Sequence, residues 1–149
     1  MPVRREGRFK NAGAKVENGI KRGLILSGQL VAQRATRQAP RDTGRLKRSI
    51  TKGNPYTTGR QRWAIDVGTN VEYAAAQEFG LLNQPITDRQ RRFFWAKHKE
   101  TGEGMWKALG LSQNYTIPMQ PYLRPALWQS EKEVHRLILA SVLGALRKK

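Results

Sequence analysis

The chain contains 149 residues, which fits one domain and leaves little room for a second. It has no cysteine, which excludes disulfide bonds and thiolate metal sites. No apolar run approaches the roughly 18 residues that a membrane-spanning helix needs, so no membrane partner is expected. The 28 Lys and Arg residues outnumber the 11 Asp and Glu residues, which gives a net charge of +17. Such a charge attracts nucleic acid, although acidic neighbours in a large assembly would explain it equally well.

A long helix is predicted over residues 9–39. An apolar stripe with spacings of four and seven runs along one of its faces. The stripe contains Val16, Ile20, Leu24, Val31 and Ala35. Glycines weaken the isolated helix, so packing must hold it, and small residues would permit close approach. About 29 helical residues would span roughly 43 Å, against a radius of gyration of about 15 Å for a compact chain. We therefore expect the helix to overhang the monomer, where a partner subunit would cover it.

Short elements are predicted in the middle of the chain. Asp42 or Thr43 can cap a helix over residues 44–49. Turn formers over residues 52–59 predict an exposed loop between two strands. Alternating apolar residues over 63–67 predict a half-buried strand. A short helix follows in this interpretation and ends at Gly80.

A cluster of aromatic residues follows a helix start signal. Residues 87–90 (TDRQ) have the pattern of a capping box, which predicts a helix to about residue 99. This helix carries Phe93, Phe94 and Trp95. Three adjacent aromatic residues cannot share one helical face, so at least one should contact another segment or subunit.

The C-terminal part of the chain predicts a break, a strand and a last helix. Glycines interrupt the chain around residues 105–109, and a strand is predicted over 115–117. The last helix is predicted over 122–146, where Pro125 is tolerated because it lies in the first turn. The inner face of this helix is expected to contain Leu123, Leu127, Val134, Leu137, Ser141 and Ala145.

The sequence offers little that resembles a catalytic site. His98 and His135 are the only histidines, and neither has a ligand-like or triad-like setting. There is no metalloprotease motif, phosphate loop or dinucleotide fingerprint. Asp66 lies opposite the apolar face of its strand and is expected to pair with an arginine. We therefore expect no enzymatic activity, no cofactor and no metal.

The basic and aromatic residues at 89–95 allow two interpretations. Arginines beside aromatic rings could clamp a single nucleic-acid strand. Alternatively, the aromatic side chains are core residues and the arginines form a solvated rim. The helix cap and the helical pattern favour the second interpretation, because stacking platforms are usually exposed on sheets.

Residues 39–50 (APRDTGRLKRSI) resemble a signature of the tail-completion, or head–tail joining, proteins of tailed bacteriophages. That family carries A-P-x-D-T-G-x-L-x-x-S-I after its first helix. Residues 67–80 resemble its central strand and short helix, and residues 120–127 (QPYLRPAL) resemble the entry to its last helix. The motif residues are Asp42, Thr43, Gly44, Gly68, Thr69, Phe79, Gly80, Pro121 and Pro125.

The segment at about 81–119 is longer than compact members of that family need. Residues 86–88 and 91–96 are similar to the related Mu-like virion morphogenesis proteins. The resemblance implies an α+β fold in which a long N-terminal and a long C-terminal helix pack a small, mostly antiparallel sheet. It also implies a single domain over residues 1–149, with the helical segment at 81–119 as an insertion.

The resemblance further implies a structural virion protein at the neck, the top of the tail. There it would form a homo-oligomeric ring, a hexamer, that completes the tail and joins it to the capsid connector and the tail tube. Genomic DNA would pass through the channel without sequence-specific contacts.

Two sets of residues are candidates for the contacts of such a ring. Five positive charges within twelve residues, next to a turn-rich loop, predict a basic surface for docking or for DNA. Its members are Arg41, Arg45, Lys47, Arg48, Lys52 and Arg60. The candidates for subunit interfaces are Val16, Ile20, Leu24, Phe93, Phe94, Trp95, Tyr122 and Leu123.

The alternative function is a free, basic nucleic-acid-binding protein without sequence specificity. It would coat DNA or RNA as a monomer or dimer, with salt-sensitive binding. A particle subunit would instead form a discrete oligomer, or order on docking, and be present in purified virions.

Overall fold

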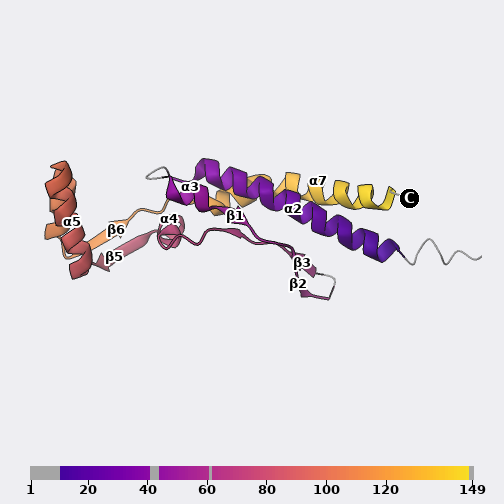
Figure 1. Ribbon diagram of the computed structural model, residues 1–149, viewed down its shortest axis with the longest axis horizontal. Helices are drawn as coiled ribbons and strands as arrows, with labels where there is room; N and C mark the ends of the chain where they lie inside the picture. The colour runs from indigo at the N-terminus through magenta and orange to yellow at the C-terminus, as the bar shows by residue number, and fades with distance from the viewer. Residues whose placement is uncertain (1–10, 41–43, 61, 148–149) are drawn as a thin grey trace, which may run out of the picture. The chain divides into compact units, whose positions relative to one another are not determined.

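The computed structural model describes residues 11–40, 44–60 and 62–147, and it has an α+β fold as predicted (Figure 1). The helices are α2 (Ala12–Gln38), α3 (Arg45–Ser49), α4 (Ala74–Phe79), α5 (Asp88–Thr101), α6 (Gly104–Leu111) and α7 (Leu123–Arg147). The strands are β1 (Thr51–Lys52), β2 (Tyr56–Gly59), β3 (Arg62–Ala64), β4 (Val67–Gly68), β5 (Leu81–Pro85) and β6 (Asn114–Ile117). Among the described residues the strands form three antiparallel pairs, β1–β4, β2–β3 and β5–β6.

The chain divides into two compact units. The helix-pair unit consists of the described residues up to Ala74 and from Pro121 onward, and it contains α2, α3, β1–β4 and α7. The hairpin unit consists of Ala75–Gln120 and contains β5, α5, α6, β6 and all of α4 except its first residue, Ala74, which belongs to the helix-pair unit.

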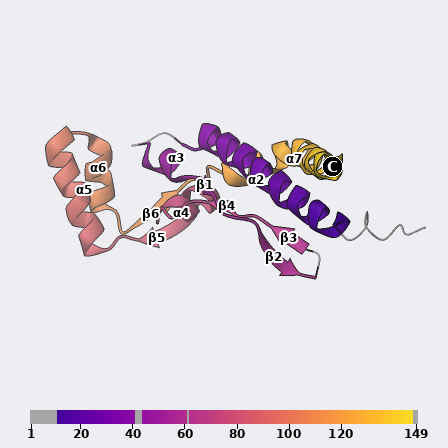
Figure 2. The same cartoon turned by 45° about the vertical axis from the view of Figure 1, so that its right-hand side comes forward.

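The long helices α2 and α7 lie side by side in the helix-pair unit, as both views show (Figures 1 and 2). Small residues line the seam of α2, where Gly19, Gly23 and Ser27 are buried. A Cβ atom at Gly23 would lie 2.6 Å from Cα of Ile138, and one at Gly19 would lie 2.7 Å from Cα of Val142. The absence of side chains at these glycines therefore permits backbone-to-backbone approach.

The expected partner subunit is not needed to cover the small-residue seam of the first helix. The α7 helix of the same chain covers the seam of α2. The predicted bounds of both helices were close to the observed ones, and small residues do permit the close approach. Which element they approach depends on long-range packing, which the local pattern does not encode.

A polar clamp also joins the two helices. Arg34 of α2 donates hydrogen bonds to the carbonyl oxygen of Gln129 (2.6 Å) and to Oγ of Ser130 (3.1 Å). Its other terminal nitrogen pairs with Oε1 of Glu133 at 2.6 Å. One forked guanidinium therefore binds three groups within about one turn of α7, a geometry that lysine cannot reproduce.

The core of the helix-pair unit brings the three motif stretches together. Its buried cluster contains Ala35, Ala39, Leu46, Ile50, Val71, Ala74, Tyr122 and Ala126. Thr51 pairs with Gly68 between β1 and β4, and the hydroxyls of Ser49 and Thr69 lie 2.6 Å apart. The motifs at 39–50, 67–80 and 120–127 thus hold one core, which explains why residues far apart in the chain form a common signature.

Glycines with positive φ values lie at the ends of helices and strands in both units. Gly44 precedes α3 with φ of +75°, and Gly80 precedes β5 with φ of +71°. A Cβ atom at Gly80 would also lie 3.1 Å from the carbonyl oxygen of Ile117. Both positions favour glycine because side chains strain this backbone region. Asp42 and Thr43, the predicted caps of α3, lie outside the described residues, and Gly44, predicted as its first residue, is the N-cap.

The hairpin unit consists of a two-stranded ribbon and two consecutive helices. The predicted capping box is confirmed: the Thr87 side chain accepts from the Gln90 amide and the Gln90 side chain accepts from the Thr87 amide. Gly102 ends α5 with φ of +72°. No residue of α5 is fully buried.

Three elements differ from the sequence-based predictions. Residues 56–59 form strand β2 rather than a loop, residues 81–85 form the unpredicted strand β5, and residues 104–111 form helix α6 rather than a break. Gly110, which suggested the break, is buried against Trp95, with a would-be Cβ 3.0 Å from the indole ring. Here glycine provides room for an aromatic ring within a continuous helix.

Candidate assembly and nucleic-acid surfaces

The residues predicted to form a basic surface divide into two groups. Arg45, Lys47 and Arg48 lie on α3, whose Leu46 packs with Ala35 and Ala39 at the end of α2. Arg60 follows β2 in a hairpin whose partner strand β3 places Trp63 under Lys21, with Nζ 4.4 Å from the ring centre. Residues 21 and 35 of a helix are separated by about 21 Å along its axis. The predicted set is therefore not one continuous patch.

The exposure of these cations differs. Arg45, Arg48 and Arg60 are exposed, whereas Lys47 and Lys52 are half-buried. Arg41 lies outside the described residues. The α3 group therefore presents the higher density of charge, with three basic side chains in one five-residue helix.

The β2–β3 hairpin is held at its base by a polar contact. The Tyr56 hydroxyl donates a hydrogen bond to Oδ1 of Asp66 at 3.0 Å. This hydrogen bond, together with the charge of the carboxylate, raises the pKa of Tyr56. Asp66 was expected to pair with an arginine, but among the described residues it forms no ion pair, and its carboxylate instead accepts from Tyr56, the first residue of β2.

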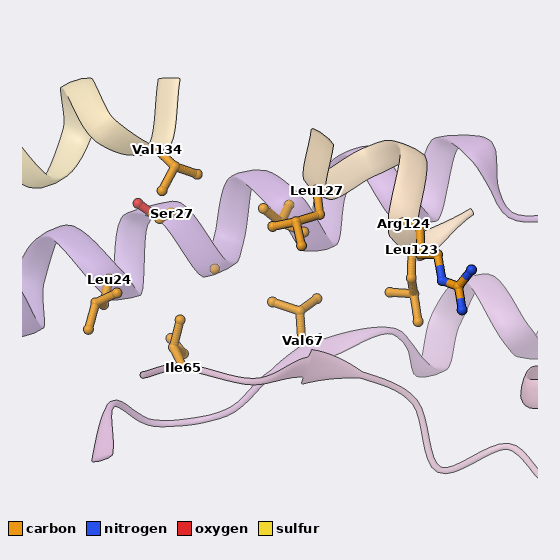
Figure 3. A pocket seen from close by; sticks show the side chains of 10 residues that line it. Leu24, Ser27, Ile65, Val67, Leu123, Arg124, Leu127 and Val134 are labelled. Atoms are coloured by element: carbon orange, nitrogen blue, oxygen red, sulfur yellow. The ribbon is translucent and has the colours of Figure 1, made fainter. Parts of the chain in front are cut away.

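An apolar groove lies on the helix-pair unit between α2, α7 and the segment at β3–β4 (Figure 3). It has a volume of about 260 Å³. Leu24, Val67, Leu127 and Ile65 face its interior, and Arg124 stands at one end (Figure 3). A Cβ atom at Gly28 would lie 2.9 Å from Cδ1 of Ile65, so this glycine allows the strand segment to approach α2.

The interface candidates of the first and last helices have different positions. Leu24 and Leu123 line the groove, and Val16 and Ile20 are half-buried on α2. Tyr122 is 0% exposed in the core, so its assignment to a subunit interface is corrected. It fills the space that Ala35, Ala39 and Ala126 leave, and no surface of it remains for a neighbour.

Leu127 was predicted on the inner face of the last helix, and the structure contradicts this. It is 53% exposed at the groove. The buried face of α7 contains the small residues Ala126 and Ser130, which meet α2 closely and turn Leu127 outward. The buried face of α7 therefore contains the small residue Ala126, whereas the hydropathy pattern indicated its larger neighbour Leu127.

The aromatic residues of the hairpin unit are partly buried against each other. Phe94 stacks on Trp106 with ring centres 6.1 Å apart, and Phe93 meets the same indole edge-on at 6.1 Å. Arg91 donates to the carbonyl oxygen of Gly110 at 2.6 Å, which ties α5 to α6. These contacts agree with the interpretation of the aromatic residues as packing residues. Phe93 nevertheless remains 52% exposed.

The acidic and histidine side chains of the described residues form no metal-binding cluster. Over residues 11–40, 44–60 and 62–147, no group of three or more His, Asp or Glu residues could hold a metal ion. His98 accepts or donates one hydrogen bond with the carbonyl oxygen of Glu103 at 3.0 Å, and His135 is exposed. None of the described helices is both long and apolar enough to span a bilayer.

The family comparison agrees with the resemblance of the motifs. Residues 6–80, half of the chain, match the HK97-gp10-like family model, described as "Bacteriophage HK97-gp10, putative tail-component". The chain belongs to this family. No curated protein and no solved structure matches it.

The family match covers the elements from α2 through α4, including the motifs at 39–50 and 67–80. The motif at 120–127, with Pro121 and Pro125, lies outside the matched range, as does most of the hairpin unit. The third motif is nevertheless tied to the first two, because Tyr122 and Ala126 complete their core.

Proposed function

We propose that this member of the HK97-gp10-like family is a structural protein of the virion that forms a ring at the head–tail junction. Six copies would complete the top of the tail and join it to the capsid connector, with the tail tube on the other side. The observation that carries the proposal is the family match, together with a core that contains all three tail-completion motifs.

The basic residues support a position near the DNA path. The helix α3 exposes its arginines on an element that the core fixes through Leu46 and Ile50. A rigid basic element suits a channel wall, because DNA has one negative charge per about 1.7 Å of helix axis and attracts cations without regard to sequence. We therefore assign Arg45, Lys47 and Arg48 to the surface that faces DNA or the docking partner.

Charge reversal on α3 tests this assignment. The triple variant Arg45→Glu, Lys47→Glu and Arg48→Glu should fold but fail to complete infectious particles. If all three side chains contact phosphates, the slope of log K against log salt should fall by about 2.7. Circular dichroism checks the fold, and DNA binding at several salt concentrations gives the slope.

A matched control distinguishes the loss of the basic surface on α3 from a mere change in the net charge of the chain. Lys132, Arg136 and Arg147 are exposed on α7, and their change to Glu alters the net charge equally. This control should retain particle completion and most of the salt slope. Normal infectious particles with the α3 variant, or equal defects in both variants, would contradict the assignment.

The second candidate is a free nucleic-acid-binding protein, which the concentration of charge on one unit favours. By sequence, residues 1–74 and 121–149 carry 22 basic and 7 acidic residues, a net charge of +15. This alternative predicts tight, salt-sensitive binding by monomers or dimers and absence from purified virions. Both predictions differ from those of the ring.

A further inference from the structure

The apolar groove of the helix-pair unit has the size of a docking site for side chains. Its volume of about 260 Å³ is below the roughly 300–1,000 Å³ that is usual for small-molecule sites. Leu127 at its mouth is 53% exposed. One or two inserted apolar side chains would fill such a groove, and they would remove Leu127 from water.

The charge distribution indicates which unit of a second copy can approach the groove. Residues 1–74 and 121–149 carry a net charge of +15, so two helix-pair units repel each other. Residues 75–120 have 6 basic and 4 acidic residues, a net charge of only +2. The hairpin unit is therefore the part of a second copy that can approach the groove with the least repulsion.

The hairpin unit also exposes apolar side chains that could fill the groove. Phe93, Met105 and Leu111 are 52%, 58% and 66% exposed on its two helices. Phe93 packs edge-on against Trp106, which restricts the projecting ring before any contact forms. A rigid aromatic anchor that enters an apolar pocket is the usual centre of a strong interface.

We propose that Phe93 on the hairpin unit of one copy inserts into the groove of the next copy, between Leu24 and Leu127. The two surfaces differ, so each contact is head-to-tail, and a series of such contacts closes into a ring if the rotation permits. This inference rests on the proposed ring and names its subunit contact. It divides the predicted interface candidates into two complementary surfaces, with Leu24 and Leu123 on one and Phe93 on the other.

Cross-linking of the full-length chain tests the contact directly. The sequence has no cysteine, so Ala96→Cys and Leu127→Cys introduce the only thiols. Ala96 is exposed on α5 three residues from Phe93, so this thiol lies beside the anchor and leaves its ring in place. A short bis-maleimide reagent tolerates geometry that a disulfide would not. The double variant should give a ladder of covalent oligomers, and the two single variants mixed together should give only a dimer. Leu139→Cys, which is 60% exposed on α7 outside the groove, is the matched control and should not cross-link to Ala96→Cys.

A complementation experiment tests the head-to-tail geometry by light scattering. Phe93→Asp and Leu127→Asp should each weaken self-association by at least about 30-fold, the effect of losing a central anchor. Each variant retains one intact surface, so an equimolar mixture should form a dimer and nothing larger. Leu139→Asp should assemble like the unchanged chain.

Several results would overturn the proposal. Loss of assembly with Leu127→Asp but not with Phe93→Asp would indicate groove-to-groove contact. Intramolecular cross-linking in a monomer would show that the hairpin covers its own groove, and a chain that never self-associates would also refute the contact. The failure of this contact is distinct from failure of the proposed function, which depends on presence at the neck of particles.

Discussion

The two units of this chain use their apolar residues differently. The helix-pair unit buries Tyr122 completely among small residues from α2, α4 and α7, and it contains all three motif stretches. The hairpin unit has no fully buried residue in α5 and leaves half of Phe93 exposed. The first unit therefore encloses an aromatic side chain completely, whereas the aromatic side chains of α5 pack mainly against Trp106 of α6 and stay partly exposed.

The same contrast appears in the charges. The unit with the core also carries almost all of the net positive charge, and the hairpin unit is close to neutral. The match to the family model covers residues 6–80, so it ends before most of the hairpin unit begins. The region that matches the family model therefore holds most of the core, and most of the hairpin unit lies outside it.

Two aromatic residues give the largest expected difference between the units. Tyr122→Ala should destabilise the chain by about 3–5 kcal/mol, because it leaves a cavity in the core. Phe93→Ala should cost about 1 kcal/mol or less, because the ring is half exposed and mainly loses its contact with Trp106. Urea unfolding followed by circular dichroism, at concentrations where the chain is dissociated, measures both. Equal losses would show that the hairpin unit has a core of its own.

Substitution of a glycine in the seam between α2 and α7 should change the stability of the helix-pair unit by a smaller amount. Gly23→Ala should destabilise by about 1–3 kcal/mol, because the new methyl group would press on the backbone of α7. Gly144 has no atom within 4 Å of a would-be Cβ, so Gly144→Ala should instead stabilise the helix by up to about 0.8 kcal/mol. Thermal unfolding compares the two. A stabilising Gly23→Ala would mean that the helices are not in close contact there.

Much of the fold could be predicted from local patterns. The long helices follow from their apolar spacing and from Pro40 and Pro125, and α5 follows from its capping box. The motif at 39–50 predicted the short helix α3 and the family. These features depend on neighbours within a few residues of each other, which a sequence displays directly.

The features that escaped prediction depend on residues far apart in the chain. Gly23 indicated close packing but not that α7 of the same chain provides it, and Gly110 appeared to break a helix because its contact with Trp95 is tertiary. The sequence alone does not show whether Tyr122 lies in the core or at a subunit interface, because an aromatic residue near the start of a helix is compatible with both. The groove arises from three separate segments, so no single stretch predicts it.

Purified phage particles provide the most direct test of the central claim. Quantitative mass spectrometry should find this chain in a few copies per virion, and electron microscopy of particles with an epitope-labelled chain should place the label at the neck. We expect both results together. A chain that is abundant in infected cells but missing from virions, or one that is distributed along the whole tail, would contradict the proposed position at the head–tail junction.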